Sequence, residues 1–190
     1  MRKLIWLMHT TLDGFVSGPN GELDWAGAAM DDELWEDVNE LMDTVDGTLF
    51  GRRTYQGFES YWPAVGKNPA SAKNELHFSH WIEETPKTVA SRTLKKLEWK
   101  NSVLMSADVA EGISRMKGQA GRDVLMFGCP GLATYLWKAG LIDELRIDVH
   151  PLMLGAGRAL SADGVVQRKL ELTKAKTFGS GVVGLRYNLG

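Results

Sequence analysis

Three segments of this 190-residue chain share one order of features: a short apolar run, a tight polar or glycine-rich turn, and then the start of a helix or a further turn. They are Thr48–Phe58 (TLFGRRTYQGF), Lys87–Leu94 (KTVASRTL) and Val124–Leu136 (VLMFGCPGLATYL). In a parallel sheet such turns lie at the carboxyl ends of strands, where open α/β folds bind ligands. The pattern therefore predicts an α/β domain with a ligand site at one edge of its sheet.

Further apolar runs add to this sheet. Residues 4–8 and 102–105 read as strands, and Asp31 or Asp32 is placed to cap a helix with one apolar face. Asp108, with Glu111 three residues later, resembles a capping box at a second helix start. In 144–151 (ELRIDVHP) apolar and polar residues alternate, which predicts a half-exposed strand with Arg146, Asp148 and His150 on its outer side. Two strand-like segments flank the turn at 179–181. We expect a sheet that begins parallel and ends in an antiparallel hairpin.

Bulk properties exclude several classes of protein. The net charge of −2 predicts no general attraction to nucleic acid or to an anionic membrane. The single cysteine, Cys129, cannot form an internal disulfide, which fits a reducing cytoplasm. The apolar run near the first residue is too short for a signal peptide, and no window approaches the ~18 apolar residues of a membrane span. We expect a cytoplasmic protein without a nucleic-acid or membrane partner.

The three turns carry groups that suit a phosphate. Arg52, Arg53 and Thr54 stand at a helix start, where free N–H groups and the helix dipole favour an anion. Ser91 and Arg92 follow the second strand, and the third turn has glycines on both sides of Cys129 and Pro130. Each turn alone is also consistent with solvated arginines or an ordinary helix entry. Their occurrence together, on strand ends of one sheet, favours a phosphate site.

Other kinds of site find less support. The chain has no Walker A lysine motif and no Gly-x-Ser-x-Gly nucleophile motif. His77 and His80 are spaced as neighbours on a helix, but no cysteine or carboxylate cluster accompanies them, so no metal site is expected. Cys129 is interpreted as a small residue packed near a ligand rather than as a reactive thiol.

Four segments in the right order give the chain a resemblance to the dihydrofolate reductase-like superfamily. They are TLDGFVS, FGRRTYQGF, VASRTL and the run FGCPGLATYLWKAGLIDELRIDVHPLMLGAGRAL. Within the superfamily, the chain most resembles the C-terminal reductase domain of the bifunctional riboflavin-biosynthesis deaminase/reductase and its stand-alone relatives. The resemblance covers nearly the whole chain. It implies one domain over 1–190, with a three-layer α/β fold: a central mixed sheet of about eight strands, a C-terminal antiparallel hairpin, and helices on both faces.

The resemblance also implies an activity and a set of cofactor residues. The activity is NADPH-dependent reduction of a pyrimidine- or pterin-type substrate, as in 5-amino-6-(5-phosphoribosylamino)uracil reductase, by a homodimer. By the resemblance, the cofactor's phosphates are held by Gly51, Arg52, Arg53 and Thr54, and its 2′-phosphate side is contacted by Ser91 and Arg92. Its pyrophosphate and nicotinamide ribose lie beside Gly128, Cys129, Pro130, Gly131 and Leu132. Its nicotinamide lies against Val16 and Ser17.

Catalytic residues are less clearly indicated. Asp13 is a candidate for organising proton delivery, although a loop aspartate more commonly bonds its own backbone. Trp25 and Trp35 are candidates for an apolar wall, and residues 16–25 for a lid over nicotinamide. The helix carboxylate that anchors pteridine in folate enzymes falls nearest Trp35, with Glu36 beside it. The chain lacks the deaminase motif. A dihydrofolate reductase, or a non-catalytic NADPH-binding protein of the same fold, remains as an alternative.

Overall fold

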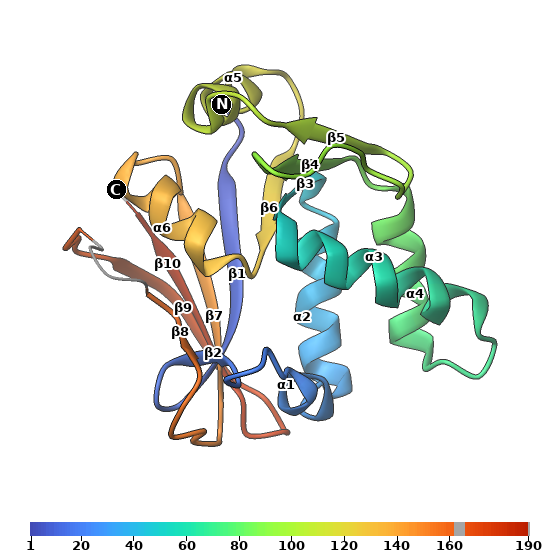
Figure 1. Cartoon of the computed structure of the whole chain (residues 1–190). Helices are drawn as coiled ribbons and strands as arrows, with labels where there is room; N and C mark the ends of the chain where they lie inside the picture. The colour runs from blue at the N-terminus through green and yellow to red at the C-terminus, as the bar shows by residue number, and fades with distance from the viewer. Residues whose placement is uncertain (162–165, 190) are drawn as a thin grey trace.

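An eight-stranded mixed sheet forms the centre of the molecule, with strand order β5-β4-β3-β6-β1-β7-β10-β9 (Figure 1). The computed structural model describes residues 1–161 and 166–189. The strands are β1 (Leu4–Thr11), β3 (Val45–Gly51), β4 (Lys87–Ala90), β5 (Ser102–Met105), β6 (Asp123–Phe127), β7 (Glu144–His150), β9 (Glu171–Thr177) and β10 (Val183–Asn188). A separate two-stranded sheet joins β2 (Phe15–Ser17) to β8 (Arg158–Ala159).

The direction of the strands changes once across the sheet. All pairs from β5 to β7 are parallel, whereas β10 pairs antiparallel with both β7 and β9. The five parallel strands from β5 to β1 are mostly short apolar runs, as strands covered by helices on both faces must be. The expected mixed sheet with a C-terminal hairpin is confirmed, and the turn at 178–182 closes that hairpin.

Within the described residues, six helices surround the sheet: α1 (Asp24–Ala28), α2 (Asp32–Met42), α3 (Arg52–Lys67), α4 (Lys73–Glu84), α5 (Val109–Gly118) and α6 (Pro130–Lys138). The expected caps are present. The carboxylate of Asp31 accepts a hydrogen bond from the backbone N–H of Leu34, and that of Asp108 accepts one from Glu111. These acceptors satisfy N–H groups that a helix start leaves without a partner.

Each face of the sheet has its own apolar core. Ile5 and Leu7 of β1 pack with α2, α3 and α4, whereas Trp6 and Met8 pack with α5 and α6. Alternation along one strand thus assigns side chains to two different layers. In the described part of the chain, no helix has the length and apolar character needed to span a membrane.

The polar side of β7 differs from the sequence prediction. Asp148 and His150 are both 0% exposed, although their alternation with apolar residues indicates an outward face. Arg186 of β10 pairs with Asp148, and the ring of Trp25 in α1 covers His150 at a centroid distance of 5.0 Å. Periodicity correctly predicts that these residues share one side. It cannot show that this side faces a helix layer with compensating charges.

Candidate cofactor and substrate site

The three turns meet at one edge of the sheet. β3 lies between β4 and β6 and is parallel to both, so the turns that follow these strands are neighbours at their carboxyl ends. They begin at Arg52, Ser91 and Gly128. The juxtaposition expected from the sequence is therefore present, and it brings together residues far apart in the chain.

Cys129 joins the first turn to the third. Its Sγ accepts a hydrogen bond from the backbone N–H of Gly51 at 2.9 Å and donates one to Thr54 Oγ1 at 3.1 Å. Burial raises the pKa of the Cys129 thiol, which keeps it protonated at neutral pH. The residue also has a left-handed backbone, with φ of +57°, which is uncommon outside glycine. These contacts give Cys129 a positioning role in the turn and make it a poor nucleophile.

The second turn is held by its own side chains. Ser91 Oγ accepts hydrogen bonds from the backbone N–H groups of Thr93 and Leu94, and Arg52 donates to Thr93 Oγ1 at 2.9 Å. The guanidinium of Arg52 thus reaches across from the first turn to the second. This contact fixes a cation between two strand ends.

Four exposed guanidiniums gather around this edge. They belong to Arg52, Arg53, Arg92 and Arg158. Within residues 1–161 and 166–189, none of them forms an ion pair with a carboxylate, unlike four other arginines of the chain. Cations left without acidic partners, two of them at the start of α3, form an electrostatic setting for a phosphorylated ligand.

Arg158 is the member of this group that sequence analysis does not single out. Its Nη2 lies 3.5 Å from the position that a Cβ on Gly131 would occupy. The β2–β8 pairing places it there, since Arg158 stands opposite Ser17. The signal in the sequence is the Gly-x-Gly-Arg run at 155–158, but only the long-range pairing shows that this arginine reaches the third turn.

Asp13 is an anchor between two loops. Its carboxylate accepts hydrogen bonds from the Thr11 hydroxyl at 2.5 Å and from the backbone N–H groups of Leu154 and Gly155. The Thr11 hydrogen bond, followed by those of Gly155 and Leu154, lowers the pKa of Asp13 against the opposing effect of burial. A carboxylate that is ionised and already bonded to three donors is poorly suited to donate a proton. It ties the start of the lid to the loop before β8.

Residues 16–25, the candidate lid, form an ordered structure held by backbone hydrogen bonds. Its first part forms β2, and hydrogen bonds from Gly18 N–H to Glu22 O and from Gly21 N–H to Gly18 O close the turn that follows. Val16 is buried against the α6 side of the core, and Ser17 is partly buried. In Figure 1, β2 and α1 lie together at the lower end of β1 and β7.

The acidic residues of α2 do not place a free carboxylate where the resemblance to folate enzymes expects one, near Trp35 and Glu36. Glu36 is exposed on the outer side of α2, and Trp35 is buried beside Phe78, with ring centroids 5.9 Å apart. The buried acid on this helix is Asp37, which is bonded to Arg186 at 2.5 Å. Helical phase explains the difference, because positions 34, 35, 37 and 38 face inward. This placement does not favour catalytic roles for Glu36 or an exposed wall at Trp35.

A line of polar side chains runs from α2 to the strand ends. Arg186 bonds both Asp37 and Asp148, the latter at 2.8 Å. Asp148 Oδ2 lies 3.8 Å from His9 Nδ1, which in turn is 3.0 Å from His150 Nε2. We refer to Asp37, Arg186, Asp148, His150 and His9 as the polar chain. Single short segments of sequence do not reveal it, because its members come from four separate elements.

The polar chain predicts a pH-dependent stability. Burial and the neighbouring His9 lower the pKa of His150 to about 4, against the opposing charge of Asp148. Between pH 4 and 6.5 the unfolded chain therefore binds more protons at this residue than the folded one, so stability falls as the pH drops through that window. We expect urea unfolding to show a loss of up to about 1.4 kcal/mol per pH unit from this group.

The His150→Gln variant should lose this part of the pH dependence. The matched control is His77→Gln, at an exposed position on α4, which should leave the profile unchanged. An unaltered slope in His150→Gln would contradict the assignment of the effect to the buried imidazole.

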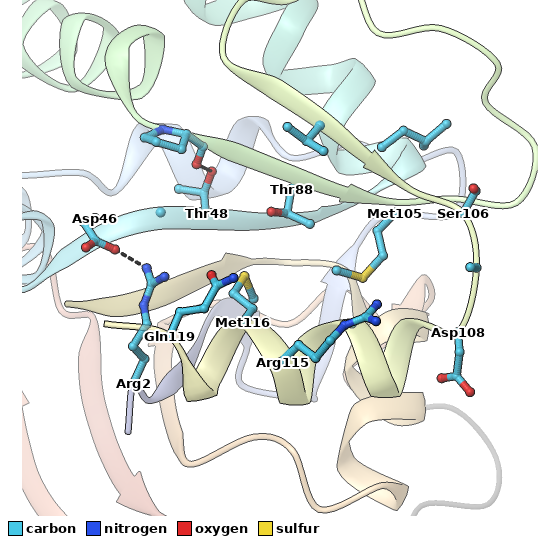
Figure 2. Close-up of a pocket in the computed structure, with 16 residues that line it drawn as sticks. Arg2, Asp46, Thr48, Thr88, Met105, Ser106, Asp108, Arg115, Met116 and Gln119 are labelled. Carbon is cyan, nitrogen blue, oxygen red and sulfur yellow. Dashed lines mark hydrogen bonds and ion pairs between the residues drawn. The ribbon is translucent and has the colours of Figure 1, made fainter. Parts of the chain in front are cut away.

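A separate pocket of about 690 Å³ lies between α5 and the adjoining strands (Figure 2). Its labelled charged groups already have partners: Arg2 with Asp46, Asp108 with the backbone N–H of Glu111, and Arg115 with the Glu111 carboxylate. It offers a ligand fewer unpaired polar groups than the edge where the three turns meet. We therefore place the candidate site at that edge.

Comparison with known proteins identifies the family of the chain. Residues 2–184 match the family model described as the RibD C-terminal domain. The uncharacterized proteins YyaP and YwjB of Bacillus subtilis (strain 168) are 30% and 24% identical, over 98% and 95% of this chain and 95% of each relative.

Solved structures share the fold. A putative riboflavin biosynthesis protein from Shewanella sp. PV-4 superposes with a TM-score of 0.79 at 20% identity, over 99% of both chains. A dihydrofolate reductase from Enterococcus faecalis, complexed with NADP(H), superposes with a TM-score of 0.63 at 14% identity, over 99% of this chain and 96% of that one. The deaminase/reductase of Thermotoga maritima superposes with a TM-score of 0.68 at 15% identity, and 57% of its length is matched. With a family match over nearly its entire length, this chain belongs to the RibD C-terminal domain family.

Proposed function

We propose that the protein is an NADPH-dependent reductase of a pyrimidine- or pterin-type substrate, similar to the 5-amino-6-(5-phosphoribosylamino)uracil reductase of riboflavin biosynthesis. The observation that carries this proposal is the set of four exposed guanidiniums without acidic partners beside three strand-end turns. Family membership supports the reductase class. The resemblance further implies a cytoplasmic homodimer.

The residues at this edge fit the cofactor. Arg52, Arg53 and Thr54 would hold phosphate oxygens, while Ser91 and Arg92 would contact the 2′-phosphate. Gly131 leaves room between the third turn and the guanidinium of Arg158, since an added Cβ would be 3.5 Å from it. When bound, NADPH would supply a hydride to an electrophilic carbon of the substrate. The chain's own part is to orient both molecules and exclude water between them.

The structure favours a pyrimidine-type substrate over dihydrofolate. By the resemblance, folate enzymes anchor pteridine through a free carboxylate on the first long helix. Here the inward acid, Asp37, is bound by Arg186 at 2.5 Å and lies 3.6 Å from the Lys174 ammonium. Burial would raise the pKa of Asp37, but the hydrogen bond and charge of Arg186 hold it below its usual value. This carboxylate is already committed to an internal partner.

Cofactor choice gives a direct test. NADPH should raise the melting temperature more than NADH at equal concentration, because fixed cations favour the extra phosphate. Arg92→Ala should reduce NADPH affinity about 10- to 100-fold, in line with the loss of one to two charge-assisted hydrogen bonds. It should also bring the rise in melting temperature with NADPH closer to that with NADH. Arg115→Ala, at an exposed arginine on α5, is the control. Equal stabilisation of the wild type by both nucleotides would contradict the assignment of a 2′-phosphate site.

Substrate turnover separates the alternatives. Loss of NADPH absorbance with the ribosylaminopyrimidine, but not with dihydrofolate, is the expected result. Turnover of dihydrofolate alone would indicate a dihydrofolate reductase. Binding of NADPH without turnover of either compound would indicate the non-catalytic alternative.

A further inference from the structure

We propose that His9 donates the proton that completes reduction of the substrate, with His150 and Asp148 positioning its ring and Arg186 fixing Asp148. This inference rests on the proposed reductase function and deepens it. Sequence analysis does not single out His9, and Asp13, the candidate for organising proton delivery, is an ionised anchor in the structure.

The position of His9 fits a role beside the hydride donor. It lies two residues beyond Leu7 on β1, and the Leu7 carbonyl accepts a hydrogen bond from the backbone N–H of Gly128 in the third turn. Because Ile5 and Leu7 pack on the α2 side of the sheet, alternation places His9 on the same side. The histidine therefore stands at the strand ends, between the cofactor turn and the helix layer that covers the polar chain.

The imidazole of His9 is held at one nitrogen and open at the other. Its Nδ1 is 3.0 Å from His150 Nε2, and in the described part of the molecule no hydrogen bond involves its Nε2. The side chain is 27% exposed, whereas His150 is 0% exposed. A ring fixed on one side and accessible on the other has the geometry required of a general acid that exchanges protons with solvent.

Buried polar atoms around the ring indicate that the cluster has more than a structural purpose. Asp148 Oδ2, His150 Nδ1 and Trp25 Nε1 are buried and have no hydrogen-bond partner among the described residues. Polar atoms buried for stability alone are almost always paired. Asp148 Oδ2 lies 3.8 Å from His9 Nδ1, and the ring of His150 contacts that of His9 at a centroid distance of 5.1 Å. Unpaired atoms on two side chains with 0% exposure beside this ring indicate a place prepared for a polar ligand.

The charges of the polar chain accommodate a proton on His9. Two buried carboxylates, Asp37 and Asp148, face one guanidinium, that of Arg186, and the half-exposed Lys174 contacts only the outer oxygen of Asp37. Asp148, which shares Arg186 with Asp37, presents its other carboxylate oxygen 3.8 Å from His9 Nδ1. The pKa of His9 is lowered from its ordinary value, because burial and Arg186 lower it more than Asp148 raises it. The facing carboxylate of Asp148 is the group that supports the protonated form of His9 against burial.

The chemical step balances as follows in atoms and charge. Bound NADPH would supply a hydride that forms a C–H bond at the carbon of a C=N or C=O group, the π pair of that group would move to its nitrogen or oxygen, and the cofactor would leave as NADP⁺. His9 Nε2 gives its proton to that nitrogen or oxygen, and the neutral imidazole regains a proton from solvent at its exposed edge.

Single-turnover kinetics across pH, with saturating NADPH and the ribosylaminopyrimidine, test this assignment. The wild-type rate should fall about tenfold per pH unit above the pKa of His9. His9→Gln should lower the rate by about 10²- to 10⁴-fold and flatten the pH profile, with NADPH affinity unchanged in a fluorescence titration. His9→Asn serves as the second variant if the first does not fold. His80→Gln, exposed on α4, is the matched control.

A readout independent of turnover comes from imidazole NMR titration of the free protein. His9 should titrate in the wild type, and Asp148→Asn should shift its pKa downward, because the facing negative charge is lost. A His9 pKa unaffected by Asp148→Asn would overturn the positioning role of Asp148. Wild-type rate and pH slope in a folded His9→Gln protein would overturn the proton-donor role while leaving the reductase proposal intact. Failure of the wild type to bind NADPH or turn over would overturn the proposed function, and this inference with it.

Discussion

Arg186→Met should lower the free energy of unfolding by about 3–5 kcal/mol, a large share of the stability of an ordinary domain. The guanidinium is the shared partner of Asp37 and Asp148, which are 6% and 0% exposed. Methionine fills similar space but leaves Asp148 without its ion-pair partner, and Asp37 with only the exposed Lys174 ammonium at 3.6 Å. Urea unfolding monitored by tryptophan fluorescence measures the change at neutral pH.

Two further variants decide whether buried charge is the cause. Arg115→Met removes an exposed arginine paired with Glu111 on one helix face, and it should change stability by less than about 0.5 kcal/mol. Combining Arg186→Met with Asp37→Leu and Asp148→Leu should restore much of the loss, because no buried charge then lacks a partner. A triple variant no more stable than Arg186→Met would show that packing, rather than charge, is what Arg186 contributes.

Gly157→Ala should reduce turnover by about 100-fold, the scale expected when a supporting element shifts by about 1 Å. A Cβ at this position would lie 2.2 Å from the Ser17 backbone oxygen, and φ is +155°. A backbone oxygen cannot rotate away as a side chain can, so β8 must separate from β2. The separation would move the lid and withdraw Arg158 from the third turn.

Gly155→Ala is the matched control for this prediction. Gly155 also has a positive φ, +72°, but an added Cβ there would meet nothing within 4 Å. It tests backbone strain without the clash. Single-turnover rates with saturating NADPH should drop in Gly157→Ala far more than in Gly155→Ala, with similar melting temperatures. Equal rates in both variants would show that the β2–β8 pairing is not needed for turnover.

Local chemistry made much of this fold predictable. Apolar runs followed by polar turns correctly indicate the parallel strands, and Asp31 and Asp108 correctly indicate two helix starts. The juxtaposition of the three turns follows from parallel pairing alone. Features that depend on contacts between distant segments were not predictable in this way. Periodicity assigns His150 to a polar face, but only the positions of α1, α2 and β10 show that this face is buried.

Candidate site residues follow the same division. Arg52 is recognisable because it directly follows a strand, and Arg92 because only Ser91 separates it from the end of one. Arg158 and His9 are recognised as candidate site residues only from long-range contacts. Arg158 pairs with Ser17 in the β2–β8 sheet, and the His9 side chain contacts that of His150. Glu36 illustrates the limit of counting along a helix, since a shift of one position turns a side chain from the core to solvent.

The contact between Cys129 and Gly51 has a consequence for how the protein is made. It joins residues 78 positions apart, and the strands that carry them are brought together by a pairing of the same range. A chain emerging from the ribosome cannot assemble the edge of three turns until β6 has been synthesised and inserted beside β3. Under the proposed function, nucleotide affinity would therefore be acquired late in synthesis, and a bound cofactor would stabilise the completed sheet rather than any smaller folding unit.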